Sequence, residues 1–177
     1  MQKKLYNRGL NMNIRNEKRA DIEPIANVTI AAFKTCPYSR QTEQFIIDAL
    51  RNAGGLSVSL VAEIDGTIVG HIAFSPITID GRSCGWYGLG PLSVLPAHQK
   101  QGIGKALMQE GISKLKSLGA AGCALVGDPN YYRQFGFKNT PGLILEGVPK
   151  ENFLALSFND PDARGTVIFH EAFTADH

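Results

Sequence analysis

One stretch, residues 89–107, constrains the fold of this chain more than any other segment. It reads LGPLSVLPAHQKQGIGKAL: an apolar strand ends near Pro96, a polar turn follows, and Gly102 and Gly104 stand at the start of a helix. Glycine lets the backbone curl tightly, so successive N–H groups point to one spot, where the helix dipole favours negative charge. The stretch therefore predicts a strand, a tight bend and a candidate phosphate site at a helix N-terminus.

Two lysines, Lys100 and Lys105, flank these glycines and suit a diphosphate better than an apolar ligand. A Walker loop is excluded, because it requires glycine in place of Gln99 and serine or threonine in place of Ala106. A dinucleotide-binding GxGxxG fingerprint is weakened, because it requires a third glycine in place of Leu107 and an acidic residue about 20 residues further on.

A second motif lies downstream. Residues 127–137 read GDPNYYRQFGF, with a tyrosine at 132 followed by Gly136 and Phe137. Tyr132 lies 28 residues after Gly104, which leaves room for one helix and one strand. Two motifs in this order and at this spacing are more specific than either alone.

Together, the two motifs resemble those of the GNAT superfamily of N-acetyltransferases. The pattern QxxGxG at 99–104, after the strand residues LSVLP at 92–96, is similar to the pyrophosphate loop of that family. The second motif resembles the segment by which GNAT enzymes place a tyrosine beside the sulfur of coenzyme A. The resemblance spans residues 13–137 and is strongest over 89–137.

The resemblance implies an α/β (α+β) fold and a cofactor site. We expect a mixed, mostly antiparallel central sheet of about seven strands, about four flanking helices and a parallel β-α-β crossover at the cofactor site. The implied cosubstrate is acetyl-coenzyme A, with its diphosphate at the bend and its pantetheine arm paired to the preceding strand as in strand addition. The residues so assigned to the cofactor are Leu92, Ser93, Val94, Gln99, Lys100, Gln101, Gly102, Ile103, Gly104 and Lys105.

The implied reaction is direct attack of an amine on the thioester, with Tyr132 as general acid toward the departing thiolate. A phenol of pKa about 10 gives its proton to a thiolate of pKa about 8.5 at a cost on the order of 2 kcal/mol. The alternative is that Tyr132 only packs under the sheet and Tyr131 takes its place. No covalent enzyme intermediate is expected, because no cysteine lies at the predicted junction.

No general base is evident. Many GNAT members carry a glutamate in the strand before the loop, but residues 86–95 contain no carboxylate. Glu63, His71 and Asp128 are candidates that would act through water. Each has a simpler explanation, because Glu63 and His71 fit a cross-strand pair and Asp128 fits a turn.

The acceptor is predicted to be a primary amine of a small molecule or a peptide. By family geometry, the loops 35–40 and 159–164 should wall its site, and specificity commonly resides in loops. Trp86 and Tyr87 are candidates for lining this site, or else belong to the core. His98 is interpreted as a solvated turn residue and His170 as a core or cross-strand residue.

Size and composition point to one domain over 1–177, with 1–11 as a disordered extension if Met12 is the true start. The net charge of +2 is scattered, so no nucleic-acid partner is expected. No apolar run is long enough for a membrane span or signal peptide. Three cysteines without metal-ligand spacing predict neither disulfides nor a metal site, hence a cytoplasmic protein. A homodimer is left open.

Apolar periodicity and turn residues predict the remaining elements. We expect Asp21 to cap a first helix, Ser39 to cap a second, and a third to span 102–119. Asp65-Gly66 and Asp80-Gly81 predict hairpin turns. The expected strands are 13–17, an antiparallel meander of three (57–64, then 67–74 with 76–79, then 84–95), 120–126, and a hairpin of 153–158 with 165–173. A short helix carries 131–135.

Two functions from other classes remain open at this point. The first is a catalytically inactive module that binds acyl-coenzyme A. The second is a nucleotide-binding redox protein that uses the bend at 99–107. Acceptor-dependent thiol release distinguishes the enzyme from the module, and a melting temperature that responds to NADH but not to coenzyme A would favour the redox protein.

Overall fold

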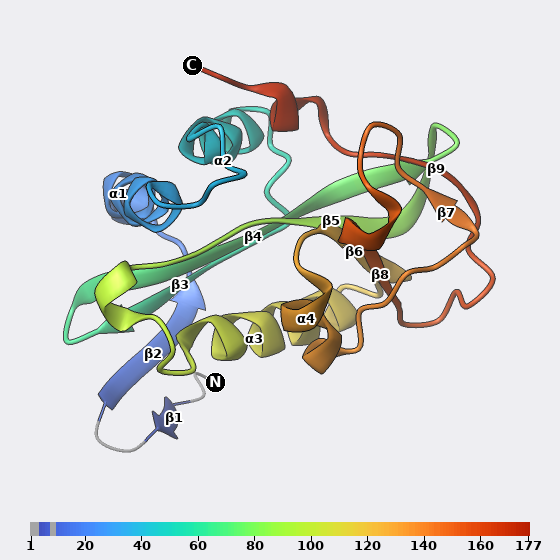
Figure 1. Cartoon of the computed structure of the whole chain (residues 1–177). Helices are drawn as coiled ribbons and strands as arrows, with labels where there is room; N and C mark the ends of the chain where they lie inside the picture. Colours follow the sequence, from blue (N-terminus) through green and yellow to red (C-terminus); the bar gives the residue numbers. More distant parts are fainter. Residues whose placement is uncertain (1–3, 8–9) are drawn as a thin grey trace.

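A long, mostly antiparallel sheet forms the centre of the computed structural model, which describes residues 4–7 and 10–177 (Figure 1). Its strands follow the order β1-β2-β3-β4-β5-β6-β8, and β9 pairs with both β4 and β7. Helices α1 and α2 lie on one face and α3 on the other (Figure 1). The fold class predicted from the sequence is confirmed.

The bounds of the elements are as follows. The strands are β1 Lys4–Asn7, β2 Leu10–Asn16, β3 Val58–Ile64, β4 Thr67–Ile79, β5 Arg82–Val94, β6 Gly122–Val126, β7 Leu143–Ile144, β8 Phe153–Ser157 and β9 Gly165–Ile168. The helices are α1 Ile22–Phe33, α2 Glu43–Asn52, α3 Ile103–Ser117 and α4 Pro129–Tyr132.

The N-terminal segment differs from its prediction. Residues 4–7 form β1 and residues 10–11 open β2, where a disordered extension over 1–11 was expected. The two strands pair antiparallel, and β2 continues the sheet onto β3. Residues 1–3 and 8–9 lie outside the described residues.

Both predicted hairpin turns are confirmed, at Asp65-Gly66 and Asp80-Gly81, and all four residues have positive φ. The predicted antiparallel meander of three strands is confirmed as β3, β4 and β5, and its middle strand β4 runs through Pro76 without a break. Proline is tolerated there because Pro76 is exposed and the register with β5 shifts between Pro76 and Thr78, where a bulge relaxes the ladder.

The β5–α3–β6 crossover is confirmed and shapes the site. β5 and β6 run parallel, and their pairing extends only from Trp86↔Gly122 to Gly88↔Ala124. Helix α3 packs on the sheet through Ile103, Leu107 and other buried residues on the same face. Beyond Gly88, β5 is therefore paired to β4 alone.

The predicted C-terminal hairpin is wrong. β8 pairs antiparallel with β6, whereas β9 pairs with the end of β4 and with β7. The Asp80 carboxylate accepts the Thr166 N–H at 2.8 Å, which fixes β9 beside the β4–β5 turn. After Ile168 the chain leaves the sheet and ends in a short 3₁₀ turn, Glu171–Thr174, instead of the expected strand.

The cap residues of α1 and α2 show why local signals were only partly right. Asp21 stands at the N-cap of α1, as predicted, but its carboxylate accepts the Lys18 N–H at 2.7 Å and binds Arg15 at 2.6 Å. The N-cap of α2 is Thr42, three residues after the predicted Ser39. Ser39 instead donates its hydroxyl to Glu43 at 2.6 Å and stabilises the loop before the helix.

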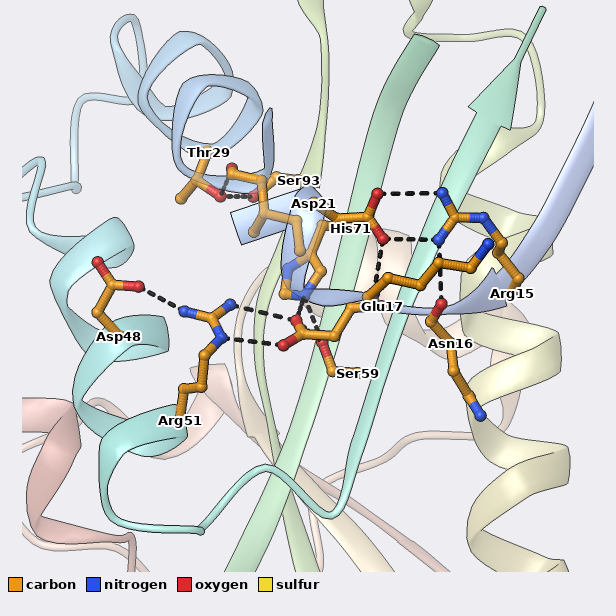
Figure 2. A network of polar contacts seen from close by, with 12 residues as sticks. Arg15, Asn16, Glu17, Asp21, Thr29, Asp48, Arg51, Ser59, His71 and Ser93 are labelled. Atoms are coloured by element: carbon orange, nitrogen blue, oxygen red, sulfur yellow. Dashed lines mark hydrogen bonds and ion pairs between the residues drawn. The ribbon is translucent and has the colours of Figure 1, made fainter. Parts of the chain in front are cut away.

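Two polar clusters fasten α1 and α2 to the sheet (Figure 2). In the first, Arg15 of β2 bridges Asp21 before α1 and Glu63 of β3, and hydrogen bonds from Arg15 lower the pKa of Asp21. In the second, Arg51 of α2 binds Glu17 at 2.9 Å. Arg15 thus ties the start of α1 to β2 and β3, and Arg51 ties α2 to the residue that follows β2.

The second cluster continues into the core and fixes the protonation of a histidine. Ser59 donates its hydroxyl to Glu17, so it must accept the hydrogen bond that joins it to His71 Nε2 at 2.8 Å (Figure 2). His71 is completely buried, and this burial lowers its pKa. His71 is therefore a neutral imidazole with its proton on Nε2.

Candidate active site

The bend after β5 has the geometry that its sequence predicts. A 3₁₀ turn, Pro96–His98, leads into Lys100 at φ 60° and Gly102 at φ 85°. The side-chain amide of Gln99 donates to the Val94 carbonyl at 3.1 Å and joins the bend to the end of the strand. A left-handed conformation at Gly102 favours glycine, because a β-carbon there would strain the backbone.

The N-terminus of α3 has no side-chain cap. Gly102 is its N-cap and has no side chain to accept a hydrogen bond from the first turn. The first backbone bond onto the cap runs from the Ala106 N–H to the Gly102 carbonyl, so the N–H groups of residues 103–105 have no partner within the helix. Exposed Lys100 and Lys105 lie beside these groups. This arrangement fits a diphosphate.

The last residues of β5 present a backbone edge next to the bend. Leu92, Ser93 and Val94 pair with β4, while the pairing of β5 with β6 has already ended at Gly88. Leu92 and Val94 line a cavity. Ser93 points the other way and is buried, with its hydroxyl 3.4 Å from that of Thr29 on α1 (Figure 2). Ser93 can therefore contribute only backbone to this edge.

A cavity of about 570 Å³ joins the strand edge to the helix N-terminus. It is lined by Ala32, Phe33, Cys36, Leu92, Val94, His98, Gln99, Lys100, Gly102, Ile103, Gly104, Lys105, Tyr131, Tyr132 and Gln134. Of the residues predicted for the site, the structure brings together on this wall all but Ser93 and Gln101. Gln101 instead donates its amide to the Ala97 carbonyl at 3.2 Å.

Tyr132 reaches the cavity from α4. Its ring packs edge-on against Tyr131 at 4.9 Å and Phe137 at 6.1 Å between ring centroids. Burial raises the pKa of Tyr132 well above the ordinary phenol value, so the hydroxyl stays protonated at neutral pH. The same packing holds Tyr132 in the wall of the cavity.

The three candidates for a general base lie elsewhere. Glu63 is bound by Arg15 at 2.7 Å, and Asp128 accepts the Asn130 N–H at 2.9 Å as the N-cap of α4. The expected Glu63–His71 cross-strand pair is wrong, because Glu63 lies opposite Ile68 and His71 lies opposite Val61. None of the described residues that line the cavity is aspartate or glutamate.

Of the two loops predicted to wall the acceptor site, the structure places only one at the cavity. Cys36, from the loop 35–40, lines the cavity, but no residue of 159–164 does. That loop lies at the other end of β5, where Asp160 accepts the indole N–H of buried Trp86 at 3.1 Å. Trp86 is thus a core residue.

Sequence reasoning missed several residues of the cavity. Ala32 and Phe33 belong to the apolar stripe of α1, and His98 was interpreted as a solvated turn residue, yet all three line it. Their sequence pattern could place these residues on a helix or in a turn. It could not show which distant segment they face across the cavity.

Cys36, Cys84 and Cys123 are free thiols, and burial raises the pKa of Cys123. Over residues 4–7 and 10–177, no three His, Cys, Asp or Glu side chains gather as a metal site. In the same residues, no helix has the length and apolar character to cross a membrane.

Comparison with known proteins agrees with this geometry. The family model of the acetyltransferase (GNAT) domain matches residues 56–139. The chain is 34% identical to YhbS of Escherichia coli K12, described as an uncharacterized N-acetyltransferase, over 65% of this chain and 70% of YhbS. The chain belongs to the GNAT family and is an N-acetyltransferase of that family.

Two crystal structures are similar over nearly the whole chain. A GNAT family acetyltransferase from Brucella melitensis, in complex with acetyl-CoA, is 49% identical with a TM-score of 0.83, over 92% of this chain and 97% of that one. Escherichia coli YhbS, in complex with CoA, is 29% identical with a TM-score of 0.86, over 96% and 95% of the two chains.

Proposed function

We propose that this protein transfers an acetyl group from acetyl-coenzyme A to a primary amine of a small molecule or peptide by direct attack, with Tyr132 as general acid. One observation carries the proposal. The uncapped N-terminus of α3, the free edge of β5 and Tyr132 all border one cavity. An extended ligand with a diphosphate at one end and a thioester at the other has this order of groups.

The cofactor assignment is supported by the residues and by the two similar structures. Backbone N–H groups at the start of α3 would bind the diphosphate, with Lys100 and Lys105 adding positive charge. The backbone of residues 92–94 would pair with the pantetheine arm. The related proteins from Brucella melitensis and Escherichia coli are described in complex with acetyl-CoA and CoA. When bound, acetyl-coenzyme A supplies the activated acetyl group.

In the proposed reaction, Tyr132 keeps its proton until charge develops on the departing sulfur. Its raised pKa means that the hydroxyl is present as a donor across the physiological range. An N–H group of β5 near Val94 would donate to the thioester carbonyl and favour the developing oxyanion. These two roles require only a fixed hydroxyl and a free strand edge.

The acceptor amine must attack in its neutral form. No carboxylate lines the described cavity, so we propose no side chain as general base. At pH 7 an α-amine of pKa about 7.8 needs about 1 kcal/mol to become neutral, whereas a lysine amine of pKa about 10.4 needs about 4.6 kcal/mol. The acceptor would enter past Phe33 and Cys36, which form the wall away from α3.

Thiol release tests the proposal. The protein is incubated with acetyl-coenzyme A and a panel of primary amines, and free coenzyme A is measured with a thiol reagent. We expect release that depends on one class of amine. Stabilisation by coenzyme A without release from any amine would instead identify the catalytically inactive module. A melting temperature that responds to NADH but not to coenzyme A would contradict cofactor and reaction together.

Three expectations from the sequence stay predictions. These are the single domain over 1–177, the cytoplasmic location and the homodimer.

A further inference from the structure

The hydroxyl of Tyr131 lies directly over the glycine at the second position of α3. A β-carbon placed on Gly104 would come within 2.8 Å of the Tyr131 hydroxyl oxygen, closer than real β-carbons approach such atoms. The next atom that it would meet, a methyl group of Val94, is 3.8 Å away. Tyr131 is thus the close neighbour that a side chain at position 104 would displace.

The tyrosine is held in this place by its ring. Tyr131 packs edge-on against Tyr132, with centroids 4.9 Å apart, and against Phe135 at 5.6 Å. Tyr131 is 36% exposed, and the burial of the rest of its side chain raises its pKa, so the hydroxyl keeps its proton. That hydroxyl donates to no residue that the structure describes, and it lies over Gly104, in the first turn of α3, whose N–H groups have no partner within the helix.

We infer that Tyr131 is a ligand of the cofactor diphosphate, to which its hydroxyl donates a hydrogen bond together with the amides of α3. The inference rests on the proposed function and assigns Tyr131 a task distinct from that of Tyr132. Both tyrosines line the same cavity, but only Tyr131 lies against Gly104 at the helix N-terminus. At that point the neutral Tyr131 hydroxyl and the free N–H groups of α3 would both donate hydrogen bonds to the same diphosphate.

Calorimetric titration with coenzyme A tests the inference without turnover. Tyr131→Phe removes only the hydroxyl, and we expect the dissociation constant for coenzyme A to rise about tenfold, as for the loss of one hydrogen bond to a charged group. Dephospho-coenzyme A and 3′-phosphoadenosine 5′-diphosphate both keep the diphosphate. We expect the same factor with each of them.

Tyr38→Phe is the matched control, because Tyr38 is 95% exposed and does not line the cavity. An unchanged affinity of Tyr131→Phe for coenzyme A would overturn the inference. So would an effect that disappears with dephospho-coenzyme A, which would place the contact at the 3′-phosphate. An effect absent with 3′-phosphoadenosine 5′-diphosphate would place it on the pantetheine arm and overturn it as well. Failure of the wild-type protein to bind coenzyme A would instead refute the proposed function.

A thermal double-mutant cycle tests the geometry without any ligand. Alanine in place of a helical glycine favours the helix, so Gly104→Ala should raise the melting temperature of Tyr131→Phe by about 2 °C. In the wild-type background the new methyl group meets the Tyr131 hydroxyl, and the rise should be less than half as large. Equal shifts in the two backgrounds would show that the hydroxyl does not lie over Gly104.

Discussion

The side-chain amide of Gln99 donates to the carbonyl of Val94 at 3.1 Å and closes the bend between β5 and α3. The sequence places Gln99 at the start of a phosphate-binding pattern, but here its amide binds protein backbone. Gln99 therefore acts on the ligand through the shape of the bend.

Gln99→Ala should weaken coenzyme A binding about fivefold, because the bend loses the bond that joins it to the strand. The free energy of unfolding should fall by less than about 1 kcal/mol, since the bond is exposed. Calorimetry and urea unfolding measure the two effects. Gln44→Ala serves as control, because Gln44 also donates to a backbone carbonyl, that of Gln41, but on α2. Equal affinities for the two variants would contradict the role of Gln99.

Two substitutions of Gly102, to alanine and to asparagine, should rank in opposite orders for stability and for affinity toward coenzyme A. Gly102→Ala must adopt φ near 85° and should cost about 1 kcal/mol of unfolding free energy. Gly102→Asn tolerates this conformation and can cap the helix, so it should be more stable than Gly102→Ala. The asparagine side chain would then accept hydrogen bonds from the N–H groups that the diphosphate needs. The asparagine variant should therefore bind coenzyme A more weakly than the alanine variant does. Urea unfolding and calorimetry give the two orders; the same order in both would count against the phosphate site.

Tyr132→Phe should lower the turnover number about a hundredfold and leave the affinity for coenzyme A nearly unchanged, because only the proton donor is lost. Burial keeps the hydroxyl of the wild-type protein protonated, so its donor role should not weaken between pH 7 and pH 9. Steady-state thiol release and calorimetry measure the two quantities. Unchanged turnover would remove Tyr132 from the role of general acid.

The Arg51–Glu17 ion pair should stabilise the fold in a pH-dependent way. Burial disfavours ionised Glu17, but the nearby His71 ring and hydrogen bonds from Arg51 and Ser59 outweigh it, so the folded pKa lies below the ordinary 4.5. A depressed carboxyl pKa contributes stability above pH 4.5 that is lost as the pH falls through the folded value. Arg51→Met should cost about 1–2 kcal/mol at pH 7, since both side chains are partly exposed, and less at pH 3. A difference that does not shrink in acid would contradict this account.

His71 should make stability depend on pH in a higher range. Its folded pKa lies below the ordinary 6.5 because burial disfavours the charged imidazole. The positive charge of Arg51 lowers this pKa further, whereas Glu17 raises it without reversing the direction. The unfolded chain then binds a proton first, so stability is complete above pH 6.5 and falls as the pH drops toward the folded value. The slope approaches about 1.4 kcal/mol per pH unit. Urea unfolding at pH 7.5 and 5.5 should show a smaller fall for His71→Gln, and equal falls would refute the assignment.

The crossover around α3 was predictable because its signals are local. Glycine at the bend, the apolar stripe of α3 and the buried run before Val126 each report on a few neighbouring residues. The same is true of the Asp65-Gly66 and Asp80-Gly81 turns, where φ preferences alone decide the chain reversal. These features position the open helix end and the free strand edge.

The partners of the tail strands were not predictable in the same way. β8 and β9 follow each other in the sequence and read as a hairpin, yet β8 adds to β6 and β9 crosses to β4. Strand pairing depends on which edges are free once the rest of the sheet has formed. The loop 159–164, assigned to the acceptor site by family geometry, is held by the structure beside Trp86 at the far end of β5.

The sequence by itself determined the bend, the helix that follows it and the presence of Tyr132 one strand later, because backbone conformation and apolar periodicity act between near neighbours. Only the tertiary structure decided that Phe33 and Cys36 face the bend and that Glu63 and His71 are bound elsewhere. It also decided that Tyr131 lies against Gly104, 27 residues earlier in the chain. Contacts of this kind depend on how layers pack around one core, and no local pattern encodes them.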